Sequence, residues 1–497
     1  MQKVQYILRE GWLIVMLAVV GTVSAQWQAR LSEREVSGTA RYVGMGGAMT
    51  AVGGDPSAVK DNPAGLGVYR RMEVAVSLGG KWDQTMQVGK EWNTPYAKFE
   101  MPQASWGFYY GNPHRTQGVV SNSFMISYNR VRQYQREYSA TINNCDNSLA
   151  DVIALKTNGL AEQYLQLEDR WNDANIGWLS LLGYDTYMIN PLANEQWGAN
   201  LQQGEKVNSA IYVRENGYMD EYALDWGMNI SNRWYVGAGI RMTSFYLSQT
   251  EQYAEKATLS DVALTNGSTL LMSGLGVNGA IGMIGHPVEW LRFGVSFITP
   301  TASTLSISNY GEMQSRLGDS TYLAQTPENT TSYEGFSLPL RLSTSVAFQW
   351  KHYGLLSFQY DYAHHKYIDC PGTQASPPAK KTLDDVHTLK VGLEVVPFSR
   401  LFINAGYVYE STFRNSDNLL PYEVNYNAVE TNTHALYTRN TQYISCGIGY
   451  RGRNLIVQAA YQYQLQDMDF QLHELCLTDG MRGRTHRFVV TLGWPNR

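Results

Sequence analysis

From residue 72 onward the chain alternates apolar and polar side chains with a period of two, which is typical of half-buried β-strands. In residues 338–350, Leu342 and Val346 share one face with other apolar side chains, whereas Arg341 points to the opposite face. The same alternation runs through residues 388–395, 455–464 and 488–494. The pattern predicts an all-β chain rather than a helical one.

Fourteen segments carry this pattern: residues 72–80, 102–111, 119–131, 209–230, 234–253, 267–285, 290–305, 334–350, 354–368, 385–396, 401–412, 440–451, 454–470 and 484–494. Tight links, such as residues 231–233 and 351–353, alternate with long polar connections, the longest being residues 133–208. Short connections on one side and long ones on the other are typical of an outer-membrane barrel. We therefore predict a 14-stranded antiparallel transmembrane β-barrel over residues 71–497.

A β-sandwich is the main alternative for many alternating strands. The strand lengths, the 34 Tyr and 13 Trp, and the one-sided loops favour an apolar band between aromatic girdles. Such a sheet must close, because an open edge in hydrocarbon leaves backbone groups unpaired at several kcal/mol each. The net charge of -5, with mixed signs, indicates no nucleic-acid partner.

The amino terminus has the features of a secretory signal peptide. Lys3 and Arg9 precede an apolar run at residues 12–20, and small residues follow at 23–25. We predict a signal peptide over residues 1–25, cut before Gln26; the alternative is a single anchoring helix. No run of 18 apolar residues follows, which excludes a helical integral membrane protein.

Four cysteines, Cys145, Cys370, Cys446 and Cys476, show no C-x-x-C pair and no metal-ligand spacing. We predict no metal site and no cofactor. Three of them, Cys145, Cys370 and Cys476, fall in long loops and could pair in an oxidising compartment. Their connectivity is left open.

Residues 26–70 do not resemble barrel strands, because they are dense in Gly, Ala and Ser and lack sustained alternation. By composition the segment is either a disordered tail or a compact plug. Pro63 fixes one φ angle and restricts Asn62 to extended conformations, and small residues permit close backbone packing. We favour a plug inside the barrel.

The order of small and polar residues in this segment resembles the amino-terminal hatch of the FadL/TodX family of outer-membrane transport proteins. More narrowly, "TARYVGMGGA" and "DNPAGLGVYR" are similar to a Bacteroidetes branch whose members are called hemin receptors or OMPP1-type proteins. Residues 290–301 and 336–348 are similar to mid-barrel strands of the family. The matching hatch residues are Ser37, Gly38, Arg41, Gly44, Gly46, Gly47, Asp55, Asn62, Pro63 and Ala64.

The resemblance implies a monomeric barrel in the bacterial outer membrane, in contact with membrane lipid and lipopolysaccharide, with its lumen closed by the hatch. It implies passive transport of hydrophobic small molecules, such as long-chain fatty acids or aromatic compounds, and no enzymatic activity. The hatch residues would have a structural and gating role. In the loop at residues 133–208, which carries apolar residues at helical spacing, we expect Trp178, Leu179, Leu181 and Leu182 to capture ligand; alternatively they pack the loop onto the barrel rim.

Other functions remain open. Haem uptake would use His364 and His365 with Tyr360, Tyr362 and Tyr367, although these residues also fit an interfacial aromatic girdle. A hydrolase is disfavoured because no G-x-S-x-G motif is present. A secretion-associated protein of the same fold and a water-filled porin are further alternatives.

Overall fold

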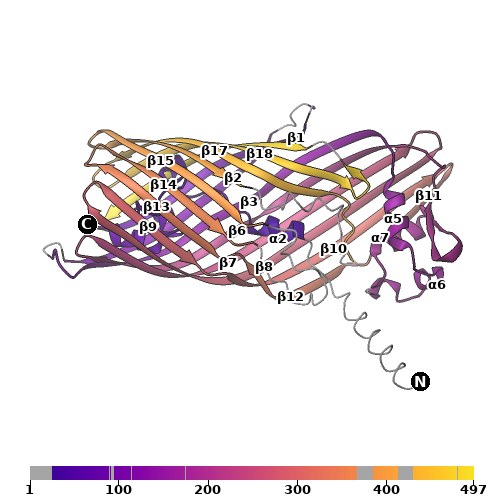
Figure 1. The fold of residues 1–497 in the computed structure, drawn as a ribbon, viewed down its shortest axis with the longest axis horizontal. Helices are drawn as coiled ribbons and strands as arrows, with labels where there is room; N and C mark the ends of the chain where they lie inside the picture. The colour runs from indigo at the N-terminus through magenta and orange to yellow at the C-terminus, as the bar shows by residue number, and fades with distance from the viewer. Residues whose placement is uncertain are drawn as a thin grey trace, which may run out of the picture.

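The computed structural model describes residues 25–496 except 89, 91–94, 113–114, 174, 366–383, 412–428 and 478–479. The predicted signal peptide lies almost entirely outside these residues. The chain forms an elongated β-barrel with small helices inside it and a group of helices at one end (Figure 1). No helix in the described part of the chain is long and apolar enough to cross a membrane.

One antiparallel sheet forms the wall. It consists of β1 (Met72–Gln87), β2 (Tyr96–Gly111), β3 (Val119–Cys145), β6 (Val207–Ile230), β7 (Trp234–Ala257), β8 (Val262–Val288), β9 (Leu291–Ile298), β10 (Thr301–Leu317), β11 (Ser320–Gln325), β12 (Asn329–Leu338), β13 (Arg341–Trp350), β14 (Gly354–Ala363), β15 (Val386–Phe398), β16 (Leu401–Glu410), β17 (Ala435–Arg451), β18 (Ile456–His473), β19 (Cys476–Leu477) and β20 (Met481–Asn496). The sheet is closed because β1 pairs with β20 along its whole length.

Several of these segments belong to one wall strand. β9 and β10 both pair with β8 and together make one wall strand that is interrupted once. β13 pairs with β9 and β12 pairs with β10, so β12 and β13 together make a second interrupted strand. β11 continues the second couple, and β19 is a short addition beside β18. Among the described residues the wall therefore has fourteen strands, which confirms the predicted number and the predicted fold.

The interruption leaves residues 299–300 and 339–340 outside the ladders, at the same height of the wall. Two of these four residues, Pro300 and Pro339, lack a backbone N–H and cannot donate to a ladder.

Many strands are longer than the sequence predicted, and four of them are especially long. β3, β6, β7 and β8 have 24 to 27 residues, and β3 continues to Cys145, so the longest connection covers residues 146–206 instead of 133–208. The extra residues lie beyond the apolar band, where polar side chains face water and the alternation of hydrophobicity fades. Strand pairing there is held by hydrogen bonds between neighbours rather than by the lipid.

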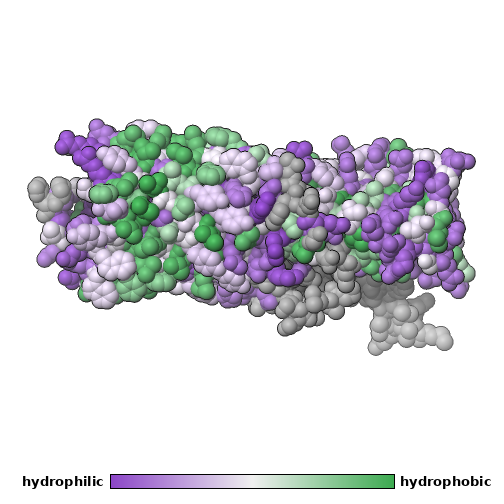
Figure 2. Space-filling view, turned by 90° about the horizontal axis from the view of Figure 1, so that it is seen from above, coloured by the Kyte–Doolittle hydropathy of each residue, from purple (hydrophilic) through white to green (hydrophobic). Residues whose placement is uncertain are grey.

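The outer wall carries an apolar band over the half of the barrel near the short turns, whereas the half near the helical end is mainly hydrophilic (Figure 2). We call these halves the turn end and the cap end. Aromatic side chains ring the turn end, close to where strands finish: Tyr110, Trp234, Trp290, Trp350, Tyr353, Tyr450 and Trp494, all exposed. The band and ring match the outer surface of transmembrane barrels.

The helical elements form two groups. The hatch (residues 25–71) contains α2 (Ala25–Ser32), α3 (Ala40–Gly44), α4 (Pro56–Val59) and η2 (Pro63–Val68) and lies inside the barrel. The cap (residues 146–206) contains α5 (Leu149–Thr157), α6 (Glu162–Leu165), η3 (Arg170–Asn172), α7 (Trp178–Asp185), β4 (Ile189–Pro191), η4 (Ala193–Glu195) and β5 (Trp197–Ala199). The cap lies over the end of the barrel opposite the short turns (Figure 1).

Candidate functional site

The first turns of the hatch are held by side chains that cap its short helices. The Asp55 carboxylate accepts hydrogen bonds from Thr39 Oγ1 at 2.8 Å and from the Ser57 backbone N–H at 2.9 Å, and so begins α4. Gly38 passes beside Ser57 so closely that a Cβ atom would lie 2.3 Å from its Oγ. Asp55 is buried, so loss of this cap leaves donors unsatisfied in the lumen.

Lys60 joins the beginning of the hatch to its middle. Its amine donates to the carbonyl oxygen of Ser37 and lies 4.4 Å from the ring centroid of Tyr42. The Tyr42 hydroxyl donates to the Asp61 carboxylate at 2.5 Å. These contacts fold the segment onto itself.

The Asn62-Pro63-Ala64 triplet is the start of η2. The Asn62 side-chain oxygen accepts from the Ala64 N–H at 3.0 Å, and Pro63 occupies the first helical position, where no N–H donor is needed. The Asn62 amide also donates to the carbonyl oxygen of Thr50 at 2.8 Å. One side chain thus caps a helix and ties two turns of the hatch together.

Glycines of the wall allow η2 to lie directly against the strands. A Cβ atom at Gly282 would lie 1.9 Å from Asn62 Oδ1, and one at Gly237 would lie 2.4 Å from the carbonyl carbon of Pro63. At Gly227 it would lie 2.6 Å from Leu66 Cβ. No other residue type fits at these three positions without moving the hatch.

The opposite wall approaches α3 in the same way. A Cβ atom at Gly406 would lie 2.3 Å from the Gly46 nitrogen, and one at Gly44 would lie 3.3 Å from Gly447 Cα. Gly46 and Gly47 have φ angles of 61° and 70°, in the left-handed region that favours glycine. The sequence analysis identified the hatch glycines but missed their partners on the wall, for which the only signal was glycine at lumen-facing positions of the strands.

Buried ion pairs fix the hatch to the wall. Arg41 donates to both carboxylate oxygens of Glu394 on β15, at 2.6 and 3.0 Å. Glu35 accepts from Lys81 at 2.8 Å and from Arg487, and Arg487 also donates to Glu100 at 2.8 Å. Breaking a buried pair by removing one partner typically costs about 3–5 kcal/mol, so these contacts strongly favour the closed position.

The end of α2 carries a further pair network. Arg30 donates to Glu33 at 2.7 Å and to Glu215 on β6, and Arg132 on β3 lies 2.5 Å from Glu33. All four side chains are buried. The first helix of the hatch is therefore fixed in the lumen by charge as well as by packing.

The lumen around α2 is apolar and is filled by packed side chains of the hatch and the wall; we call this part of the lumen the apolar chamber. Trp27 and Leu31, which are 1% and 0% exposed, enter it from the hatch. Its wall is formed by Val131, Tyr134, Met219, Phe245, Leu247, Leu270, Met272, Leu305, Ile307, Phe336, Leu338 and Val386. Because transmembrane barrels normally have polar interiors, this lumenal cluster distinguishes the protein from a water-filled pore.

A small polar cavity of about 100 Å³ lies between the chamber and the hatch. Lys60, Asp61 and Arg34 of the hatch face Lys390 and Glu410 of the wall across it. Ile298 and Arg341, at the interruption of the wall, also line this cavity. A second opening of about 320 Å³ lies on the other side of the hatch, lined by Arg41, Asp55 and Arg451 among others.

The cap has its own core, and the four predicted capture residues belong to it. Trp178, Leu179, Leu181 and Leu182 form α7, as their spacing predicted, but they are only 1%, 4%, 0% and 0% exposed. They pack against α5 and against the ends of β10 and β11. Helical periodicity indicates an apolar face but does not show which element packs against that face. Their burial favours the alternative in which these residues pack the loop onto the barrel, rather than the one in which they form an outer capture surface.

Charged groups that are half-buried or buried lie where the cap meets the barrel. Lys156 of α5 lies 2.8 Å from Glu474, which precedes β19. Burial lowers the pKa of Lys156 to about 8, against the opposing effect of Glu474. Burial raises the pKa of Glu430, also in this region, to about 8, and Lys156 partly offsets the rise.

The candidate haem ligands are engaged by neighbouring side chains. The Tyr362 hydroxyl lies 2.7 Å from His364 Nδ1 and donates to Asp385, and the Tyr360 hydroxyl lies 2.6 Å from His387 Nδ1. His365 is buried beside the polar cavity. Tyr367 lies outside the described residues. The two histidines do not converge on one empty space, and Tyr360 faces outward as a girdle residue would.

Three cysteines are described, and none of them forms a disulfide; Cys370 lies outside the described residues. Cys446 is exposed on the wall, whereas Cys145 and Cys476 are buried at the cap end beside His473. Cys145 and Cys476 come together without a C-x-x-C pair in the sequence, and His473 is three residues before Cys476.

No family model and no curated protein matches the sequence. Solved structures do match. The Pseudomonas putida toluene transporter TodX shares 11% identity with a TM-score of 0.52, and a Pseudomonas aeruginosa FadL homologue shares 10% with a TM-score of 0.54; each alignment covers 93% of this chain and 99% of the other. The Ralstonia pickettii toluene transporter TbuX aligns over the same shares at 12% identity and a TM-score of 0.50. The chain therefore has the fold of these transporters: a closed 14-stranded barrel.

Proposed function

We propose that this protein is a passive outer-membrane channel for hydrophobic small molecules, of the FadL/TodX type. The observation that carries the proposal is the apolar chamber inside the barrel, between the cap and the main body of the hatch. The shared fold supports it, because structures with this fold include toluene transporters. We place the turn end in the periplasm and the cap outside the cell, as is usual for such barrels.

The chamber provides a driving force for ligand binding without an energy source. Burial of apolar surface contributes about 25 cal/mol per Å². Trp27 and Leu31 already use this surface, so an apolar ligand competes with α2 for it. Ligand entry then displaces α2, and its ion pairs through Arg30 and Glu33 transmit the displacement to the rest of the hatch.

The gating role belongs to the hatch residues that the sequence singled out. Arg41 and Asn62 hold the closed position through charge and helix capping, and the glycines permit close contact with the wall. Release is proposed to occur sideways, beside Ile298 and Arg341, where the polar cavity reaches the interruption of the wall. There the strand ladders do not have to be broken to make an exit.

The test is uptake by cells that express or lack the protein, with labelled long-chain fatty acid, toluene and hemin measured in parallel. Met272→Trp places a larger side chain in the chamber, and Leu275→Trp on the same strand faces outward and serves as its control. We expect deletion and Met272→Trp to lower the fatty acid or toluene flux, with no effect of Leu275→Trp. Unchanged fluxes after deletion would refute transport, and a loss confined to hemin would replace this function with haem uptake.

A further inference from the structure

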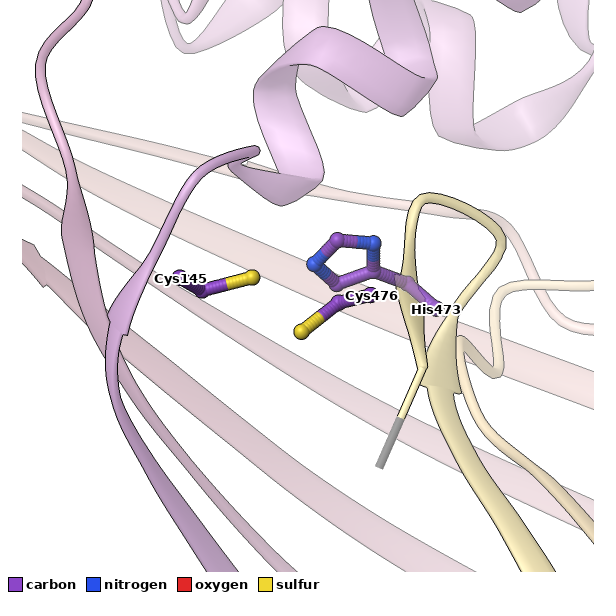
Figure 3. A group of neighbouring side chains, drawn as sticks. All are labelled: Cys145, His473 and Cys476. Carbon is purple, nitrogen blue, oxygen red and sulfur yellow. The ribbon is translucent and has the colours of Figure 1, made fainter. Parts of the chain in front are cut away.

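Two thiols and an imidazole meet at the junction between the cap and the barrel. Cys145 ends β3, directly before the cap, and His473 and Cys476 flank a two-residue turn between β18 and β19. Figure 3 shows the two sulfur atoms and the imidazole ring gathered in one small space beneath a helix of the cap. One atom of each side chain lies within 4.8 Å of the corresponding atoms of the other two.

The environment of His473 indicates that a partner is missing. The side chain is 1% exposed, yet neither ring nitrogen has a hydrogen-bond partner among the described residues. The backbone of Asn147 lies beside the ring without making a hydrogen bond of normal geometry. A buried imidazole without partners costs free energy, which a bound metal ion would recover.

We propose that Cys145, His473 and Cys476 form a binding site for a zinc ion. Thiolate sulfur and imidazole nitrogen are the ligands that Zn²⁺ prefers. With Zn–S bonds of about 2.3 Å and Zn–N bonds of about 2.0 Å, tetrahedral ligands lie about 3.5–3.8 Å apart. The observed spread of up to 4.8 Å is close enough for side-chain rotation alone to complete the site.

Charge and position support this assignment. Binding releases the two thiol protons to solvent, and the two thiolates then neutralise the ion in a buried place. A disulfide between Cys145 and Cys476 is the competing chemistry, but it would leave His473 without a partner. The zinc site satisfies all three side chains at once.

The site would hold Cys145, the residue directly before the cap, against the turn between β18 and β19. Two interactions already join the same segments: the Lys156–Glu474 ion pair at 2.8 Å and a hydrogen bond from the Asn147 side chain to the carbonyl oxygen of Leu475 at 3.3 Å. A metal ion at this point links β3 to the turn after β18, which are more than 300 residues apart in sequence. Zinc would therefore fix the base of the cap, where the chain leaves β3, against the turn after β18.

The experiment uses the full-length protein, extracted from outer membranes with free thiols protected and then exposed to Zn²⁺ or Co²⁺. We expect about one zinc ion per chain by elemental analysis, and a thiolate-to-cobalt charge-transfer band with Co²⁺. Cys145→Ser, Cys476→Ser and His473→Asn should each lose the ion. Cys446→Ser, which removes the exposed thiol of the wall, should retain it.

Three results would overturn the proposal: a Cys145–Cys476 disulfide in the protein as extracted, no metal in the reduced wild-type protein, or equal metal loss in Cys446→Ser. The cobalt spectrum of the wild-type protein decides the matter even if a variant fails to fold. Hydrogen exchange gives a second measurement, because removal of zinc should speed exchange in α5 and leave that of the hatch unchanged.

Discussion

The contact between Gly282 and Asn62 allows a sharp test of how the hatch is held. In Gly282→Ala the new methyl group would lie 1.9 Å from Asn62 Oδ1 and 2.9 Å from its Cγ, so the Asn62 side chain must move. Movement sacrifices the hydrogen bonds to the Ala64 N–H and the Thr50 carbonyl, both buried. Overpacking and unsatisfied buried groups each cost about 1–3 kcal/mol.

Because every 1.4 kcal/mol corresponds to a factor of ten, either cost alone should increase the population of an open hatch about 5- to 150-fold. Hydrogen exchange of residues 56–68, followed by mass spectrometry, measures that population when the hatch recloses faster than its open state exchanges. The matched control is Gly279→Ala in the same strand, where the nearest atoms to a new Cβ are 3.9 Å away. Its exchange should equal that of the wild type.

A double variant identifies the cause. Asn62→Ala removes the group that the new methyl would strike, so Gly282→Ala should add little to it. Equal exchange in Gly282→Ala and Gly279→Ala would refute the claim that close glycine contacts hold the hatch. If the effects of Gly282→Ala and Asn62→Ala on hatch opening are fully additive, the contact between these two residues is not the cause of the opening.

Three other predictions concern charge, route and pH. Arg41→Met should lower the free energy of hatch opening, measured by hydrogen exchange, by about 3–5 kcal/mol, because Glu394 is left buried and unpaired. Adding Glu394→Gln in the same chain should recover part of this loss. A double variant whose opening free energy equals that of Arg41→Met within experimental error would contradict this explanation. Ile298→Trp should lower uptake by narrowing the cavity at the wall interruption, whereas Val295→Trp, which faces outward, should not; equal fluxes would argue against the sideways route. Burial raises the pKa of Glu430 from 4.5 to about 8, so the folded cap binds more protons than the unfolded chain between these values and loses stability as pH rises through them. Exchange in α5, corrected for intrinsic rates, should therefore be slower at about pH 5 than at about pH 8, and Glu430→Gln should remove the difference.

Much of the barrel follows from local sequence because strand alternation is a local property. Each lumen-facing and lipid-facing position repeats every second residue, so fourteen strands and their faces can be counted without knowing their neighbours. The alternation failed for the outer half of β3, where Arg132 and Arg136 interrupt the apolar face, and the strand was predicted to end too early. Likewise Asn62 and Pro63 carry the local signal of a helix start, which the structure contains.

Contacts between distant segments could not be predicted in this way. Helical spacing identified α7, but its four large apolar residues turned out to be buried in the cap because a neighbouring element, not the helix itself, decides what an apolar face meets. Gly276 and Gly282 lie on the same lumen-facing side of β8, yet only Gly282 contacts the hatch.

The sequence alone determined the number of strands, the inward and outward faces, and a segment of small residues ahead of the first strand, because period and composition are properties of short stretches. Only the tertiary structure decided that Arg41 pairs with Glu394, that Trp27 enters an apolar chamber, and that Cys145 meets His473. These pairs are brought together by closure of the barrel and by insertion of the hatch. Closure depends on all fourteen strands at once, so no local pattern specifies which distant residues it brings into contact.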